Sequence, residues 1–426
     1  MAFPVMRSLV LSIYRIRSLL SILVLTGCVD QIPYNLTGSI DLVIVDGLIN
    51  NLPEAQIISL SRSKSDPLTG RPGFLPITGA SVQVIVDSSQ VVEAQEIKAG
   101  TYRLPSDFRG QVGHAYQLRF TLQDGTKYLS SQQIMPSVPP IKAVSGRFNP
   151  ASLPASMFGG FTAGHDLYLD TQDPAGEVNY YRWDWRLWEK QDWCRSCVQG
   201  AYSIHKVAAR YNEFGNVYFE TLDALLEDCF PAPPPRNGVP LNYWVYDYEC
   251  RTPCWAILAG TSLNLFADSY TDGGLIANRK VAEVPFYQHG PCLVEIRQAG
   301  LTASAYRFYK DLQDQTQNNG GVADPPPTAS VGNVQNTADR REIVVGFFSA
   351  SAVATMRHWL DRKDARGVPP GLFMALNGRE PEPEPAFPNI PFLQILDKHT
   401  NSSRPYKAVC AENEQQTALK PAGWLD

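Results

Sequence analysis

Histidine is scarce in this sequence, and the motifs that organise common catalytic sites are missing. The six histidines are dispersed, and none belongs to an H-E-x-x-H or another spaced zinc motif. The sequence also lacks a G-x-S-x-G elbow, a phosphate-binding loop and a dinucleotide fingerprint. Acidic pairs such as Asp268 and Asp272 occur, but spacing in the sequence does not set the distance between two carboxylates. We therefore predict no catalytic residue, no metal site and no cofactor.

Long hydrophobic runs are absent except for one short stretch near the N-terminus, Leu19–Leu25, which only Ser21 interrupts. It is shorter than the roughly 20 apolar residues that a membrane-spanning helix needs. Basic residues precede it, and small residues and then Cys28 follow it, which is the order of parts in a lipoprotein signal. We expect residues 1–27 to be a signal peptide, Cys28 to be lipidated and residues 28–40 to be a tether. The alternatives are an ordinary signal peptide or a membrane anchor with an incidental cysteine.

Charge is also scarce, since Asp, Glu, Lys and Arg make up 19% of the residues and no basic run occurs. Acidic residues exceed basic ones by 42 to 37. Loss of Arg7, Arg15 and Arg17 with the signal peptide leaves 34 basic residues against 42 acidic ones, a net charge of −8. Nucleic-acid binding depends on Lys and Arg that neutralise phosphates. We therefore expect no nucleic-acid partner.

Cysteines are few, and beyond Cys28 there are seven: Cys194, Cys197, Cys229, Cys250, Cys254, Cys292 and Cys410. In an exported protein such cysteines form disulfides, and an odd count leaves at least one unpaired. The sequence does not choose the pairing, but the candidates for disulfides are Cys194, Cys197, Cys229, Cys250, Cys254 and Cys292. A zinc knuckle on the two short pairs, 194/197 and 250/254, is the alternative. Disulfide bracing of long loops is favoured outside the reducing cytosol.

Glycine and proline are plentiful, at 31 and 33 residues, and the apolar segments between them are short, which indicates a mainly β fold. Residues 82–86 and 116–122 alternate between apolar and polar side chains, as strands with one buried face do. Asp124-Gly125 predicts a hairpin turn. About six such strands within residues 41–138 predict a β-sandwich of the immunoglobulin or transthyretin kind.

Residues 139–426 are expected to form a larger β-rich second domain with long loops and one clear helix. Its most distinctive strand is aromatic and spans residues 177–189, with one face buried and one exposed. The helix is predicted at residues 301–312, where apolar residues recur at helical spacing. Thr302 or Ser304 is positioned to cap its N-terminus.

Four of the eight tryptophans lie close together, at positions 183, 185, 188 and 193. Trp183 and Trp185 share the buried face of the aromatic strand, so we interpret them as core residues. Trp188 and Trp193 lie where the strand gives way to a cysteine-rich loop, and we predict that they contact a ligand, for example by stacking on sugar rings. The segment 268–274 suggests calcium, but it lacks the full EF-hand ligand series and is interpreted as a turn.

Several segments together carry a resemblance to a known family. They are Cys28-Val29-Asp30, Leu42-Val43-Ile44-Val45-Asp46-Gly47, Ile77-Thr78-Gly79-Ala80-Ser81-Val82, Gly100-Thr101-Tyr102, Ala305-Tyr306-Arg307-Phe308-Tyr309-Lys310, Asp324-Pro325-Pro326-Pro327 and Val345-Gly346-Phe347-Phe348-Ser349-Ala350-Ser351. With them the chain resembles, nearly to Trp424, the uncharacterised Bacteroidota lipoprotein family called domain of unknown function 4249. Members of that family tend to end with paired cysteines. Here Cys410 stands alone before Lys420-Pro421-Ala422-Gly423-Trp424, so the resemblance does not supply a partner for Cys410.

The resemblance implies an outer-membrane lipoprotein, often encoded beside TonB-dependent barrels of the starch-utilisation type, and it implies no ligand and no catalytic residue. Val29 rather than Asp after Cys28 also favours the outer membrane over other destinations. We therefore expect a lipid-anchored accessory or ligand-binding partner of a TonB-dependent transporter, with a glycan or a peptide as ligand. The alternatives are a surface glycan-acting hydrolase and a structural envelope lipoprotein.

Overall fold

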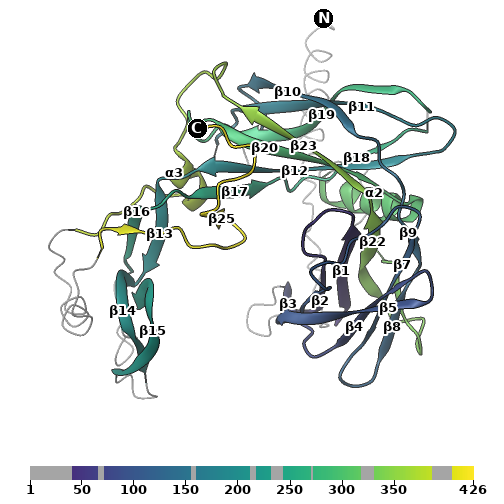
Figure 1. Cartoon of the computed structure of the whole chain (residues 1–426), viewed down its shortest axis with the longest axis horizontal. Coiled ribbons are helices and arrows are strands. Elements are labelled where there is room, and N and C mark those ends of the chain that lie inside the picture. Colours follow the sequence, from purple (N-terminus) through teal and green to yellow (C-terminus); the bar gives the residue numbers. More distant parts are fainter. Residues whose placement is uncertain are drawn as a thin grey trace, which may run out of the picture. The chain divides into compact units, whose positions relative to one another are not determined.

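Figure 1 shows the computed structural model, which describes residues 41–65, 72–154, 160–211, 217–231, 243–269, 272–317, 331–385 and 405–426. The predicted signal peptide, the lipidation site Cys28 and the tether lie outside the described residues. Leu42–Ser63 and Phe74–Asp426 together form one compact unit. No helix in the described ranges is both long enough and apolar enough to span a bilayer.

The fold is mainly β, as predicted, and it begins with a β-sandwich. Its N-terminal strands are β1 (Val43–Asn50), β2 (Ile57–Ser65), β3 (Pro72–Pro76), β4 (Ser81–Val86), β5 (Gln90–Lys98), β6 (Thr101–Arg103), β7 (Ala115–Thr121), β8 (Lys127–Ser130) and β9 (Gln133–Ile134). Seven of them are neighbours in the order β8-β7-β4-β5-β6-β2-β1. Short turns connect most of them, which suits the many glycines and prolines.

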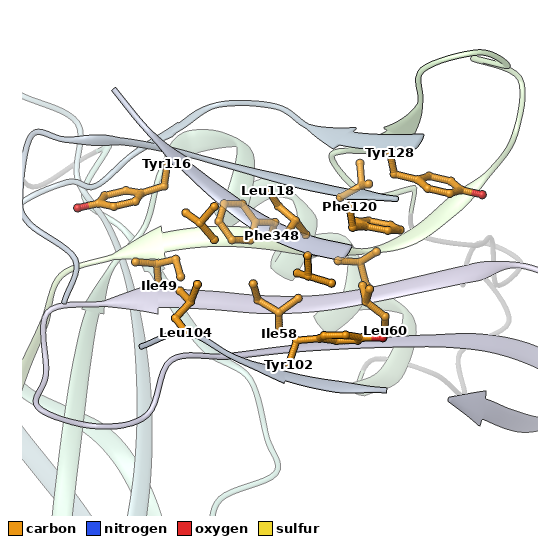
Figure 2. Packing of buried hydrophobic residues seen from close by; sticks show 14 of the residues in the cluster. Ile49, Ile58, Leu60, Tyr102, Leu104, Tyr116, Leu118, Phe120, Tyr128 and Phe348 are labelled. Atoms are coloured by element: carbon orange, nitrogen blue, oxygen red, sulfur yellow. The ribbon is translucent and has the colours of Figure 1, made fainter. Parts of the chain in front are cut away.

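The core of this sandwich follows from the predicted alternation. Every second side chain of β4 and β7 is buried, including Leu118 and Phe120. Figure 2 shows these two side chains facing Ile58 and Leu60, which come from β2. Burying each such side chain stabilises the fold by about 1.5–3 kcal/mol. The predicted N-terminal β-sandwich is therefore confirmed.

Two strands from far along the chain complete this sandwich. They are β21 (Val334–Asn336), which pairs with β8, and β22 (Val344–Ser351), which runs parallel to β1 with Gly346 opposite Val45. Most side chains of β22 are buried, so this segment covers the edge that β1 would otherwise expose. The predicted domain boundary at residue 138 therefore does not separate the two sets of strands. β22 lies in the predicted second domain but pairs with β1 of the first sandwich.

A second sandwich follows in the chain. Its strands are β10 (Ile141–Asn149), β11 (Gly164–Gln172), β12 (Tyr180–Lys190), β17 (Trp255–Ala259), β18 (Asn264–Ala267), β19 (Leu275–Pro285), β20 (Cys292–Gly300), β23 (Val353–Leu360) and β25 (Gln416–Thr417). One sheet has the order β10-β11-β19, and the other has the order β23-β20-β12-β17-β25 with β18 also on β12. Leu167 and Val284 of the first sheet share a core with Trp183 and Ile296 of the second. The interpretation of Trp183 as a core residue is confirmed, and Trp185 is half-buried against the same core.

The predicted helix is present as α2 (Ala303–Gln317). The Thr302 hydroxyl accepts a hydrogen bond from the backbone N–H of Ala305 at 3.2 Å, which is the predicted cap. Leu301 and Ala305 are buried in one cluster with Phe347 of β22. The helix α2 therefore packs on β22, the strand that pairs with β1 of the first sandwich.

The remaining elements are β13 (Trp193–Val198), β14 (Gly200–Tyr211), β15 (Val217–Pro231), β16 (Val245–Cys250), β24 (Lys407–Ala408) and a second helix, α3 (Leu372–Asn377). β13, β16 and β24 form a small sheet, and β14 and β15 form a two-stranded ribbon. Only one clear helix was expected. Because α3 has six residues, of which only Leu372 is buried, it leaves no helical period in the sequence. Gly378 ends it in the left-handed conformation, with φ of 68°.

Candidate functional site

Trp193, one of the two predicted ligand contacts, lines a groove of about 880 Å³. The groove is bounded by the start of β13, by α3 and its flanking residues, and by the C-terminal segment 413–416. Its volume lies within the range of about 300–1,000 Å³ that is typical of small-molecule sites. The contribution of α3 and of the C-terminal segment has no local signal in the sequence.

Disulfides fix the walls of this groove. Two of them attach β13 to β16 and β15, and the third attaches the start of β17 to the C-terminal segment: Cys194–Cys250, Cys197–Cys229 and Cys254–Cys410. The thiols of the alternative zinc knuckle are therefore consumed, because zinc binds thiolates and not disulfide sulfurs. The favoured interpretation of disulfide bracing agrees with the geometry at these three pairs.

The cysteine assignment needs one correction. Cys292, predicted to form a disulfide, is a free buried thiol of β20 that packs in the core of the second sandwich. Burial raises the pKa of this thiol to about 12. Cys410, for which the sequence supplied no partner, pairs with Cys254 across 156 residues. The sequence did not indicate Cys254 as the partner, because two cysteines so far apart leave no local pattern.

An aromatic pair crosses the groove. The rings of Trp193 in β13 and Phe373 in α3 have centroids 5.8 Å apart and an interplanar angle of 59°. The Arg379 guanidinium lies 5.2 Å from the Phe373 centroid and donates to both carboxylate oxygens of Asp247, at 2.5 and 2.8 Å. Burial acts to raise the pKa of Asp247, but hydrogen bonds from Arg379 and Ser196 hold it below its usual value. This ion pair therefore fixes α3 to β16 and keeps Phe373 beside Trp193.

The rest of the lining combines amide side chains with apolar ones such as Ile257 and Met374. The Gln191 amide donates to the Gln416 side chain at 2.9 Å, and the Gln288 amide donates to the Lys190 carbonyl at 2.8 Å. Two exposed carboxylates, Asp192 and Glu380, also line the groove. Amides both donate and accept hydrogen bonds, and aromatic rings present apolar faces. This combination suits a sugar, which has hydroxyl groups at its rim and C–H groups on its ring faces.

Trp188, the other predicted ligand contact, is buried and is not part of the groove. It packs with Trp255 and Leu293, and two guanidinium groups cover it: Arg186 at 5.0 Å and Arg357 at 5.1 Å from the ring. The prediction that Trp188 contacts a ligand is therefore wrong, because cation–π packing occupies the ring face. Trp193 stays a predicted contact, now with its surroundings defined.

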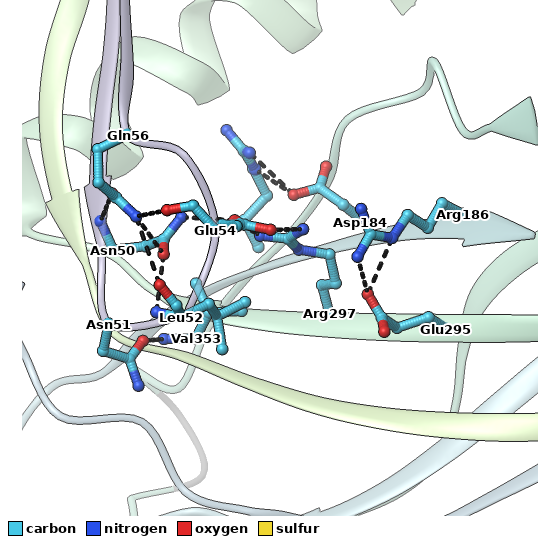
Figure 3. Close-up of polar contacts among 11 residues, drawn as sticks. Asn50, Asn51, Leu52, Glu54, Gln56, Asp184, Arg186, Glu295, Arg297 and Val353 are labelled. Carbon is cyan, nitrogen blue, oxygen red and sulfur yellow. Dashed lines mark hydrogen bonds and ion pairs between the residues drawn. The ribbon is translucent and has the colours of Figure 1, made fainter. Parts of the chain in front are cut away.

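Figure 3 shows the polar network that continues from Arg186 toward the first sandwich. Arg186 pairs with Glu295 at 2.9 Å, and Arg297 donates to Glu54 in the β1–β2 connection at 2.9 Å. The Arg297 guanidinium counteracts the effect of burial and lowers the pKa of Glu54. The network fixes the β1–β2 connection on β20. Because its charged side chains are paired with one another, we interpret them as structural rather than ligand-binding.

Three carboxylates lie close together at the segment 268–274, of which residues 270 and 271 lie outside the described residues: those of Asp173, Asp268 and Asp272. Asp173 accepts a hydrogen bond from the Tyr181 hydroxyl of β12, Asp268 from the Asn179 backbone N–H and Asp272 from the Gly176 backbone N–H. Burial, with the neighbouring Asp173 carboxylate, raises the pKa of Asp268. These bonds agree with the interpretation of the segment as a turn.

Comparison with known proteins places the chain in a family. Residues 29–357 match the model of the family described as a domain of unknown function, DUF4249. The chain belongs to this family. No curated protein and no solved structure matches it. Membership agrees with the resemblance found in the sequence and assigns no ligand to the groove.

Proposed function

We propose that this protein is a lipid-anchored outer-membrane protein that captures a glycan and serves as an accessory of a TonB-dependent transporter. One observation carries the ligand-binding part of the proposal: the Trp193–Phe373 pair lies in a groove of about 880 Å³ lined by amides. Such a groove binds a sugar ring through the aromatic faces and its hydroxyl groups through the amides.

Three further observations support the location. The leader ends in the order expected of a lipoprotein signal, with Cys28 as the acylated residue. Three disulfides suit an oxidising compartment such as the periplasm or the cell surface. The third observation is that the chain belongs to the domain of unknown function 4249 family. The resemblance to this family implies an outer-membrane lipoprotein that is often encoded beside a TonB-dependent barrel.

Co-purification tests the proposal. The tagged protein is extracted from native outer membranes in mild detergent, and its partners are identified by mass spectrometry beside a Cys28→Ala control. The proposal predicts that a TonB-dependent barrel co-purifies in stoichiometric amount and is lost in the control, because the unacylated chain is no longer anchored in the membrane. A lipidated protein that purifies alone would contradict the accessory role and leave a structural envelope lipoprotein.

A surface hydrolase is the second candidate, because Asp192 and Glu380 line the same groove. Glycoside hydrolysis uses two carboxylates that flank the scissile bond. Incubation of the chain with any glycan that it binds, followed by product analysis, separates the two functions. Release of shorter oligosaccharides that Asp192→Asn and Glu380→Gln both abolish would establish the hydrolase, whereas intact glycan supports capture alone.

A further inference from the structure

A second hollow, distinct from the groove, opens at the edge of the second sandwich. It is a cleft of about 970 Å³ lined by β19 of one sheet and by β12, β17 and β18 of the other. Trp185 and Leu258 line this cleft, and both are half-buried and pack against the core of the second sandwich. The apolar part of the lining includes Leu153, Pro154, Trp185, Leu258, Leu263 and Val281. An apolar body inserted here would be shielded from water by both sheets.

Gly260 keeps the cleft open. Its backbone N–H donates to the Trp185 carbonyl at 3.0 Å, and a Cβ at this position would lie 2.5 Å from the Trp185 ring nitrogen. The indole therefore lies against the backbone of residue 260, and any side chain there would displace the ring. Because the core behind the ring is close-packed, the displaced ring and the added side chain would both occupy the volume of the cleft.

One cation in the cleft lacks an anion. Arg279 donates from Nη2 to the Asn264 side chain at 2.9 Å and to the Leu265 carbonyl at 3.3 Å, and its Nε is buried without a partner. In the part of the chain that the structure describes, it forms no ion pair with a carboxylate, unlike the buried Arg182 and Arg362. Burial lowers the pKa of this guanidinium, which nevertheless stays charged at neutral pH.

The other charges of the cleft compensate one another. Lys280 pairs with Asp166 at 2.9 Å and with Glu283 at 2.8 Å, and Asp166 also accepts a hydrogen bond from Ser152 at 2.6 Å. Arg279 therefore leaves a positive charge at the cleft that no described acid neutralises. Its guanidinium lies over the Trp183 and Phe266 rings, at 5.5 and 5.7 Å from their centroids, and an anionic ligand group would add the ion pair that this half-buried charge lacks.

We propose that this cleft binds a long-chain carboxylate, with the alkyl chain on Trp185 and Leu258 and the carboxylate on Nη1 of Arg279. Nη2 is used by Asn264 and Leu265 and Nε is buried, so Nη1 is the nitrogen that can donate a charge-assisted hydrogen bond to a carboxylate oxygen. About 0.8 kcal/mol per buried CH₂ makes the alkyl chain the main source of affinity, and Arg279 selects the charged head. This site is independent of the proposed glycan groove and of lipidation.

Calorimetric titration tests the proposal on the chain from Val29 to Asp426, exported to an oxidising periplasm by a foreign signal peptide. The probes are dodecanoate, below its micelle concentration, and dodecan-1-ol, which has the same chain without the charge. We expect dodecanoate to bind at least tenfold more tightly than dodecanol. Equal affinities, or no binding of dodecanoate, would overturn the proposal, and this comparison needs only the wild-type chain.

Variants then place the ligand in the cleft. Arg279→Met keeps the apolar stem, so it should weaken dodecanoate binding at least tenfold and leave dodecanol binding unchanged. Gly260→Leu should weaken both probes, because it fills the cleft. Arg307→Met, which removes an exposed arginine of α2, is the matched control and should change neither. Circular dichroism checks that each variant is folded, and full dodecanoate affinity in a folded Arg279→Met chain would refute the assignment.

Discussion

The carboxylate of Glu189 and the guanidinium of Arg362 form a fully buried ion pair that attaches the end of β12 to the turn after β23. Arg362 also donates to the backbone carbonyls of Pro285, Gln288 and Gly290, at 2.9–3.0 Å. Burial raises the pKa of Glu189, and Arg362 opposes that rise. The pair therefore holds together the two segments that carry Gln191 and Gln288 into the groove.

Removing one member of this pair should be strongly destabilising. Arg362→Met leaves an uncompensated buried carboxylate, and we expect the free energy of unfolding to fall by about 3–5 kcal/mol. The double variant with Glu189→Met should be more stable than this single variant, because no isolated charge remains. Urea denaturation measures both. The control, Lys363→Met, breaks an exposed pair with Asp361 and should change little. A loss below about 1 kcal/mol in Arg362→Met would contradict the buried pair.

One thiol should remain in the exported chain, and it should be inaccessible. Three disulfides use six of the seven cysteines after Cys28, and Cys292 is fully buried. Iodoacetamide should not label the native protein, because reaction requires an exposed thiolate. In denaturant without reductant, it should label Cys292 alone, as peptide mass spectrometry would show. Labelling of Cys410 under those conditions would disprove its bond to Cys254.

Gly346 tests the parallel pairing of β22 with β1. Its φ is 91°, and a Cβ there would lie 1.9 Å from the Val45 carbonyl oxygen. Gly346→Ala should therefore reduce the free energy of unfolding by about 2–4 kcal/mol. Gly367→Ala is the matched control, since φ there is 95° and no atom lies within 4 Å of the added methyl. Equal losses in the two variants, measured by thermal denaturation, would count against the strand pairing.

Some of this architecture could be predicted from the sequence because its cause is local. Alternation along β12 placed Trp183 in the core, and the position of Thr302 before an apolar helical pattern located the start of α2. Both signals act over a few residues. Trp193 lines a groove, but it lies at the start of β13, where the sequence had predicted a cysteine-rich loop.

The failures share a long-range cause. Trp188 was predicted to contact a ligand from its place near the end of the aromatic strand, whereas Arg357 of β23, distant in the sequence, packs on its ring together with Arg186. Phe373, the aromatic partner of Trp193, lies 180 residues further along the chain in a helix too short to show a period. The joining of β22 to β1 likewise connects segments about 300 residues apart. Pairings of this kind depend on the folded topology, which local patterns do not encode.

Buried histidines should make the stability depend on pH. His165 has no exposed side-chain surface, and its Nε2 lies 3.0 Å from Asp364. Burial lowers the pKa of His165, with Arg362 acting in the same direction and Asp364 against it. Burial also lowers the pKa values of His205 and His358. Unfolded histidine titrates near 6.5, so below that pH the unfolded chain binds more protons than the folded chain.

The free energy of unfolding should therefore be at its full value above about pH 6.5 and decrease as the pH falls below that value. Urea midpoints at several pH values measure this dependence. His165→Asn should make it shallower, whereas His289→Asn, which replaces an exposed ring, should leave it unchanged. An unaltered slope in His165→Asn would show that His165 does not contribute.

The most direct test of the account is whether the groove binds a glycan. The purified chain from Val29 to Asp426 is screened on oligosaccharide and peptide arrays beside a Trp193→Ala/Phe373→Ala double variant and a control, Tyr218→Ala, which removes an exposed aromatic residue of β15. We predict that the wild type and the control bind an oligosaccharide and that the double variant loses at least tenfold in affinity, about 1.4 kcal/mol. No oligosaccharide bound, or equal binding by the double variant, would contradict the account.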